Sequence, residues 1–312
     1  MKHFKSPSMS YILVEEQEEH RHDASVGEAT IFSSIINICN TILGSGVLIM
    51  PFAFAKVGWG VAIVLVIFSA CASAMGMWLL TRVGILYDKL ITDESNTQFA
   101  SLRHMPPSFF SLAAITYPPL ARFFDIAIGI KCLGVSVSYL IVIGQYMPVI
   151  MGLLTDSSLL TAKTTWIVIA LIVISPLAFK ERLDSLKTTS SIALIAVIYL
   201  VILVISYYGI ASRDGKIEGI PHEVFPPLTF ANLDFIEFLK IFPAFVFAFT
   251  CHQNVLSVYN ELENPSNTRL LRIIAVSISS SCLIYTTMGF LGYTLFGSDV
   301  SDNIVLMCNL IY

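Results

Sequence analysis

Residues 37–51 lie inside a membrane-spanning segment that cannot form one continuous helix. The apolar run around them extends from about Ala29 to Phe54. It is long enough to cross a bilayer, whose hydrocarbon core of ~30 Å takes ~20 helical residues. Its middle contains Gly44 and Gly46, and glycine favours the helix less than any residue except proline. Backbone groups freed by a break are tolerated in lipid only where protein or a polar cavity satisfies them, so we expect a binding site near mid-membrane.

The composition places the rest of the chain in the membrane as well. Apolar residues make up 55% of the 312 residues and charged residues only 13%, whereas a soluble domain carries about 25% charged residues. The net charge of -4 argues against a nucleic-acid partner, which calls for a basic face. We therefore expect an all-α polytopic membrane protein in a lipid bilayer. Its predicted spans are 29–55, 59–81, 123–152, 164–179, 189–210, 236–259 and 270–297.

The two ends of the chain differ from this membrane domain, which we assign to residues 29–312. Residues 1–28 are polar and acidic, which predicts a disordered tail. Residues 303–312 are apolar but only half as long as a span. Either the chain is truncated after about seven spans, with further C-terminal spans missing, or these residues dock on the bundle without crossing the membrane. Between the second and third spans, Ser108–Ile115 is predicted to form a short interfacial helix.

The distribution of Lys and Arg predicts the orientation of the domain. If the N-terminus is cytosolic, twelve of these residues fall on the cytosolic side and five on the opposite side. Cytosolic loops carry the excess of Lys and Arg, so the sequence predicts a multi-pass protein with its N-terminus in the cytosol.

The sixth predicted span contains a second irregularity. Thr250, Cys251, His252, Gln253 and Asn254 follow one another in the middle of the segment, and polar side chains there are costly unless they face the bundle interior. Because glycine is absent, two interpretations stay open at this point. The helix is broken here, or it continues with its polar patch turned inward.

Paired irregularities in corresponding spans are the best sequence pointer to a transporter site. A helix that starts near Gly46 offers unpaired N–H groups and a positive dipole end, which suit a carboxylate. Carbonyls freed near Leu43 and near residues 249–251 would suit an α-ammonium group or a cation, so the predicted ligand is a small-molecule amino acid. The candidate binding residues are Asn40, Thr41, Gly44, Ser45, Gly46, Thr250, Cys251, His252, Gln253 and Asn254.

Structural roles remain open for several of these residues. Gly44, Ser45 and Gly46 would also permit a tight helix crossing, and Asn40 would also serve as an interhelical hydrogen-bonding residue. Lys131 lies inside the third span, either as a coupling or gating charge or as a side chain that reaches the interface. His252 is a candidate for proton coupling because its unperturbed pKa is near ~6.5, but a neutral histidine bonded to a carbonyl fits as well.

These segments resemble the amino acid/auxin permease family, in particular its vacuolar amino-acid transporter branch and, more distantly, the sodium-coupled neutral amino-acid transporters. The resemblance is carried by residues 40–54, 130–140, 176–179, 249–254 and 261–265. It implies a LeuT-like inverted-repeat fold of eleven spans and amino-acid transport coupled to H+ or Na+. Two departures concern coupling: Gln253-Asn254 replaces the Pro-Glu of animal relatives, and Gln145 stands where vacuolar relatives often have Asp. If the chain has this fold, its second repeat would lack three of its five helices.

The leading hypothesis is therefore a secondary amino-acid carrier that works by alternating access in a vacuolar or lysosomal membrane, or in the plasma membrane. The alternatives are a non-transporting amino-acid sensor and an inactive truncated fragment. A seven-helix receptor is disfavoured, because such receptors place their N-terminus outside. No nucleophile–base pair or metal-ligand spacing stands out, so we expect no enzyme activity, no metal and no cofactor beyond a coupling ion.

Overall fold

The computed structural model describes residues 27–93, 102, 105–179, 187–213 and 235–297. The predicted tail up to residue 26 and the apolar segment 303–312 lie outside these residues. In the described part of the chain, the secondary structure is helical apart from one isolated backbone bridge between Ala29 and Leu262. The prediction of an all-α polytopic membrane protein is confirmed.

Each of the seven predicted spans corresponds to one helix or one pair of helices. The first is a pair, α2 (Ile31–Ile42) and α3 (Gly46–Val57), bent by 50°. The sixth is also a pair, α9 (Phe235–Ala248) and α10 (His252–Glu261). The others are α4 (Trp59–Thr92), α6 (Ala121–Gly152), α7 (Lys163–Ala178), α8 (Lys187–Arg213) and α11 (Asn267–Phe296).

The α4 helix is longer than predicted, and the α7 helix is shorter than the ~30 Å hydrocarbon core of a bilayer. The α4 helix continues eleven residues past the predicted end at 81, because the Tyr87 hydroxyl reaches the carbonyls of Leu102 and Met105 at 3.2 and 3.1 Å and ties the extension to the following loop. That loop holds α5 (Phe109–Thr116), so the short helix predicted at 108–115 is confirmed. The α7 helix has 16 residues, about 24 Å at 1.5 Å per residue.

The break between α2 and α3 is built by local backbone geometry. The α2 helix begins after Thr30, whose side chain accepts a hydrogen bond from the Ser33 amide at 3.2 Å. It ends at Leu43, whose amide donates to the Cys39 carbonyl at 2.7 Å and whose ψ of 65° leaves the helical region. The α3 helix then starts at Gly46 without a side-chain cap. The interruption predicted for residues 40–50 is thus present.

The break between α9 and α10 covers residues 249–251. Of the two interpretations left open by the sequence, the structure supports the broken helix. The two interrupted spans run in opposite directions, because α3 packs against α9 while α2 contacts α10. Two backbone hydrogen bonds, from Ala29 to Glu261 and from Glu263 to Ala29, also join the start of α2 to the end of α10 at 2.9 and 3.0 Å.

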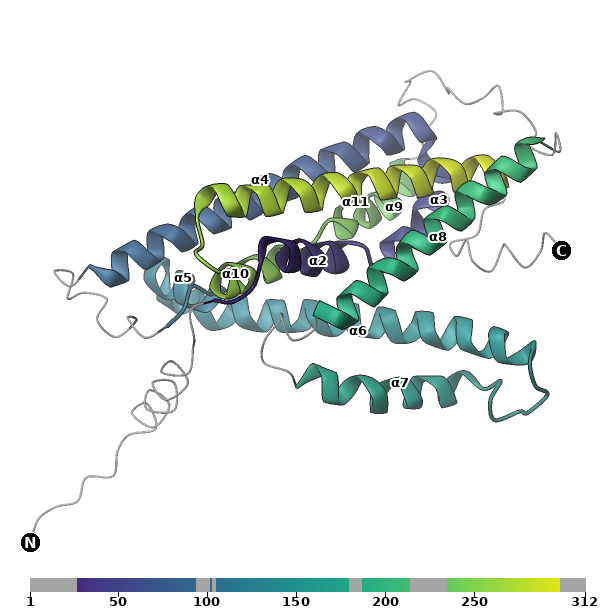
Figure 1. Ribbon diagram of the computed structural model, residues 1–312, viewed down its shortest axis with the longest axis horizontal. Helices are drawn as coiled ribbons and strands as arrows, with labels where there is room; N and C mark the ends of the chain where they lie inside the picture. The colour runs from purple at the N-terminus through teal and green to yellow at the C-terminus, as the bar shows by residue number, and fades with distance from the viewer. Residues whose placement is uncertain (1–26, 94–101, 103–104, 180–186, 214–234, 298–312) are drawn as a thin grey trace, which may run out of the picture.

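The long helices α4 and α11 lie side by side and enclose α3 with α9 (Figure 1). Fully buried side chains gather there, including Met50, Phe54, Phe245 and Met288. The α6 and α7 helices pair with each other at the edge of this bundle. Their outward side chains, such as Ile130, Leu133 and Ile172, are 66–68% exposed, which suits a lipid environment. The core therefore surrounds the two interrupted helices.

Candidate binding site between the interrupted helices

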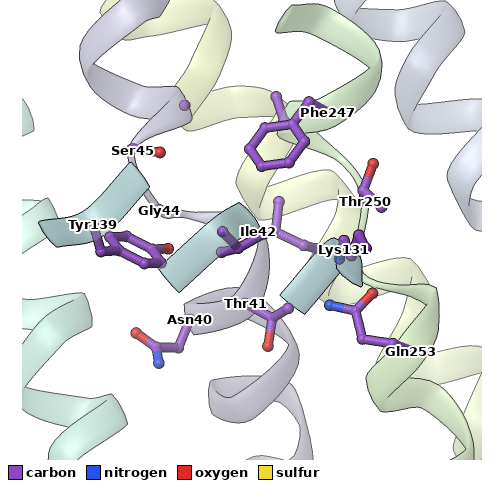
Figure 2. Close-up of a pocket in the computed structure, with 13 residues that line it drawn as sticks. Asn40, Thr41, Ile42, Gly44, Ser45, Lys131, Tyr139, Phe247, Thr250 and Gln253 are labelled. Carbon is purple, nitrogen blue, oxygen red and sulfur yellow. The ribbon is translucent and has the colours of Figure 1, made fainter. Parts of the chain in front are cut away.

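A cavity of about 240 Å³ lies where the two interruptions face α6 (Figure 2). All five residues predicted from the first span line it: Asn40, Thr41, Gly44, Ser45 and Gly46. Five residues close together in sequence can all face one space because the helix is interrupted between Ile42 and Gly46. The break thus presents backbone and side chains to the cavity together.

The second span contributes fewer of its predicted residues. Thr250 and Gln253 line the cavity, whereas Cys251, His252 and Asn254 do not. Cys251 is fully buried, with its sulfur 3.2 Å from the Met77 sulfur of α4. His252 also faces α4, since a Cβ atom placed on Gly76 would lie 2.5 Å from the His252 Nε2.

Asn254 makes a direct connection between the two interrupted spans. Its Nδ2 donates to the Thr41 Oγ1 at 2.7 Å, and Thr41 donates to the Asn37 carbonyl at 2.9 Å. Asn40 lines the cavity and also donates to the Ser190 Oγ of α8 at 3.3 Å. The two roles considered for Asn40, cavity lining and interhelical bonding, are therefore compatible in one geometry.

The backbone amides of Ser45 and Gly46 open the α3 helix. Within the described residues, neither amide donates to a backbone carbonyl, as expected for the first groups of a helix. The Ser45 amide donates instead to the Tyr139 hydroxyl of α6, and a Cβ atom on Gly44 would overlap that hydroxyl. Glycine at position 44 therefore lets the aromatic side chain approach the break.

Several carbonyls at the two breaks, which the sequence predicted to be available for a ligand, are already hydrogen-bonded to protein side chains. The Tyr285 hydroxyl of α11 lies 2.5 Å from the Ile42 carbonyl and 3.1 Å from the Ala248 carbonyl, so it can donate to either break. The Ser73 hydroxyl donates to the Phe249 carbonyl at 2.7 Å. Three of the carbonyls freed at the breaks thus already have protein partners. In contrast, no donor among the described residues bonds the carbonyls of Leu43 and Thr250.

Lys131 lines the cavity from α6 together with Val135 and Tyr139. These residues recur at every fourth position, so they share one face of the helix. In the part of the chain that the structure describes, no carboxylate pairs with Lys131. Tyr139 and the cavity-lining Phe247 were not among the sequence candidates. The four-residue spacing from Lys131 would have pointed to Tyr139, whereas Phe247 is one of several phenylalanines in α9.

Two interrupted membrane-spanning helices around a small cavity, lined in part by polar residues, define a polytopic helical membrane protein with a cavity inside its bundle. The chain belongs to the family described as transmembrane amino acid transporter protein, whose family model matches residues 27–310. The resemblance inferred from the sequence is therefore confirmed.

Several curated relatives are similar over most of this chain. Vacuolar amino acid transporter 5 of Schizosaccharomyces pombe is 40% identical, over 91% of this chain and 62% of its own length. Vacuolar amino acid transporter 6 of Saccharomyces cerevisiae is 30% identical, over 89% and 58%. Sodium-coupled neutral amino acid transporter 7 of Danio rerio is 24% identical, over 97% and 61%. The chain thus spans about three fifths of the length of these relatives, which are named as transporters and not as enzymes.

Proposed function

We propose that the chain binds an amino acid at the interrupted helices and carries it across a vacuolar or lysosomal-type membrane. The observation that supports this most directly is the cavity itself, which is lined by the start of α3 at Ser45 and Gly46 and by the polar side chains of Thr250 and Gln253. The names of the relatives support the substrate class and the membrane.

In this proposal the main chain recognises the two charged groups that all amino acids share. The amides at the start of α3 hold the α-carboxylate, helped by the positive end of the helix dipole. The carbonyl of Thr250, which lines the cavity and accepts no hydrogen bond from the described residues, receives the α-ammonium. Recognition by backbone groups leaves side-chain selectivity to the rest of the lining.

The hydrogen bonds between the two interrupted spans suggest how transport would occur. The opposite directions of the two interrupted spans support a LeuT-like inverted-repeat arrangement. The bonds that join α2 to α10, at Thr41–Asn254 and at Ala29–Glu261, favour movement of these two halves as one unit. Rocking of such a unit against the neighbouring helices would open the cavity to one side at a time, as in alternating access.

The coupling ion is proposed to be H+ or Na+. His252 is the candidate for proton coupling, and its position against α4 would link protonation to the packing of α10. Lys131 is the candidate for a fixed charge or gate, because it lines the cavity. We expect His252→Ala to abolish uptake driven by a pH gradient, and an unchanged proton dependence would remove His252 from the mechanism.

The runner-up function is an amino-acid sensor that binds without transport. Flux of a labelled amino acid into vesicles that contain the purified chain separates the two. The carrier predicts saturable flux in the wild type and loss of flux in Gly44→Ala, with Gly134→Ala as a control because that glycine has open space around it. Saturable binding without flux would favour the sensor, and neither binding nor flux would favour an inactive fragment.

A further inference from the structure

The two ends of the bundle are closed differently. We call the end that holds α5 and the last turn of α10 the α5 side, and the opposite end, towards which α3 runs, the α3 side (Figure 1). A second cavity of about 480 Å³ shares Ser45, Gly46 and Phe247 with the first and is also lined by Gln145 and Pro243. It extends the space towards the α3 side. No residue of α5 or of the last turn of α10 lines either cavity.

On the α5 side, two neighbouring residues in the last turn of α10 bind parts of the chain outside the interrupted helices. The Tyr259 hydroxyl donates to a carboxylate oxygen of Asp88 in α4. The Asn260 Nδ2 donates to the Pro107 carbonyl, just before α5, at 3.0 Å. A hydrogen bond to a charged acceptor is stronger than one between neutral groups, so Tyr259 makes the stronger of the two connections.

The segment that carries Pro107 is itself held in place from two helices. The Tyr87 hydroxyl of α4 donates to the Met105 carbonyl at 3.1 Å. The Ser111 Oγ of α5 donates to the Pro106 carbonyl at 3.0 Å. The partner of α10 is therefore anchored at both ends.

The α10 helix also packs closely on this side. A Cβ atom on Gly84 of α4 would lie 3.3 Å from the Leu256 Cδ2 and 3.8 Å from the Pro107 Cβ. Glycine at position 84 thus lets α10 and the segment before α5 approach α4 together. Close packing and hydrogen bonds both hold α10 against α4 at this end.

We propose that the hydrogen bonds Tyr259–Asp88 and Asn260–Pro107 form a latch that keeps the α5 side closed while the α3 side is open. This inference rests on the proposed transport function. Alternating access requires the α5 side to open as well, and α10 must then leave α4 and break the latch. Because Ala29 is bonded to Glu261, the α2 helix moves with α10.

Two native cysteines can report this movement, because each lies between the moving pair and a neighbouring helix. Cys251, directly before α10, is fully buried with its sulfur 3.2 Å from the Met77 sulfur of α4. Cys39 of α2 is buried with its sulfur 3.5 Å from the Ser280 hydroxyl of α11. Position 251 is eight residues from Tyr259, about 12 Å along a helix, so fraying of the last turn alone does not expose it.

The test is the rate at which a membrane-impermeant methanethiosulfonate reagent labels each cysteine of the full chain in lipid nanodiscs, located by mass spectrometry. The rate depends on the minor population in which α10 has left α4. Tyr259→Phe should speed labelling of Cys251 and Cys39 about tenfold, as expected for the loss of one hydrogen bond to a charged group. Asn260→Leu should act in the same direction but less strongly.

Tyr293→Phe is the matched control, because no hydrogen bond of its hydroxyl is found among the described residues. It should label as the wild type does. Hydrogen–deuterium exchange in the middle of α11 should stay unchanged in Tyr259→Phe, which separates opening of the latch from general unfolding.

Unchanged labelling of Cys251 and Cys39 in Tyr259→Phe would overturn the latch, and so would faster labelling that is matched by faster exchange in α11. Faster exchange confined to residues 257–262, without faster labelling, would show that Tyr259 only stabilises the last turn and would also overturn it. These results leave the proposed function intact where the same wild-type sample binds an amino acid. Failure of the wild type to bind any amino acid would overturn both.

Discussion

The Asn254 side chain donates a hydrogen bond of 2.7 Å to the Thr41 hydroxyl and so joins α10 to α2 beside the cavity. These two residues lie in different interrupted spans, separated by more than two hundred positions. The hydrogen bond lies inside a membrane bundle, where an amide or hydroxyl that loses its partner is costly. It makes the two half-helices dependent on each other.

The first prediction concerns this link. Thr41→Val and Asn254→Leu should each destabilise the protein, and the double variant should lose less than the sum of the two, with a coupling of about 1 kcal/mol. The measurement is a double-mutant cycle of unfolding free energies in detergent. In the control cycle, Thr294→Val takes the place of Thr41→Val, because the Thr294 hydroxyl bonds carbonyls of its own helix. Additive losses for Thr41 and Asn254 would contradict the link.

Tyr285 provides the second prediction, because its hydroxyl serves the freed carbonyls of both breaks. Tyr285→Phe keeps the ring but leaves the buried carbonyls of Ile42 and Ala248 without that donor, at a cost of about 1–3 kcal/mol. Tyr293→Phe on the same helix is the control, since no hydrogen bond of its hydroxyl is found among the described residues. Equal stability of the two variants in thermal unfolding would show that the Tyr285 hydroxyl is dispensable.

The third prediction tests the close approach of α6 to the first break. Gly44→Ala places a methyl group on the Tyr139 hydroxyl, so it should weaken amino-acid binding at least several-fold. The added variant Tyr139→Phe removes that hydroxyl and should restore part of the binding. If Gly44→Ala binds as the wild type does, or if Tyr139→Phe does not help, the contact does not shape the site.

Packing between α3 and α11 gives the fourth prediction. A Cβ atom on Gly289 would lie 2.5 Å from the Cδ2 atom of the Phe54 ring, so Gly289→Ala overpacks the core and should cost about 1–3 kcal/mol. The additional change Phe54→Leu should recover much of this loss. Gly129→Ala, which meets open space, is the control. Unfolding midpoints that do not differ between Gly289→Ala and Gly129→Ala would argue against this packing.

Much of the fold was predictable, because membrane spans and their interruptions depend on local composition. The apolar lengths located the helices of all seven predicted spans, although only six of these, counting the bent pair α2 and α3 as one, are long enough to cross a membrane among the described residues, and Gly44 with Gly46 located the first break. The second break was ambiguous in sequence, since Thr250 to Asn254 fit an inward polar face as well as an interruption. Only the three-dimensional arrangement distinguishes these two cases.

The candidate site was predictable in its position but not in its contacts. Tyr285 and Ser73 lie on helices remote in sequence from the carbonyls that they bond, and no local pattern indicates such pairs. The sequence also did not indicate which helix the His252 side chain faces. Where the chain leaves the helix, periodicity no longer tells which side chains share a face, so His252 turned out to face α4 while Gln253 faces the cavity.

Hydrogen–deuterium exchange of the full chain in nanodiscs, followed by mass spectrometry, tests the central claim most directly. Among the described residues, the Ser45 amide is bonded only to the Tyr139 hydroxyl and the Gly46 amide donates to no backbone carbonyl, so exchange here should slow once a carboxylate binds these amides. We expect an added amino acid to slow exchange in peptides that cover residues 43–48 and to leave peptides from the middle of α4 unchanged. Unchanged exchange at residues 43–48 in a sample that binds the amino acid would contradict recognition by these main-chain groups.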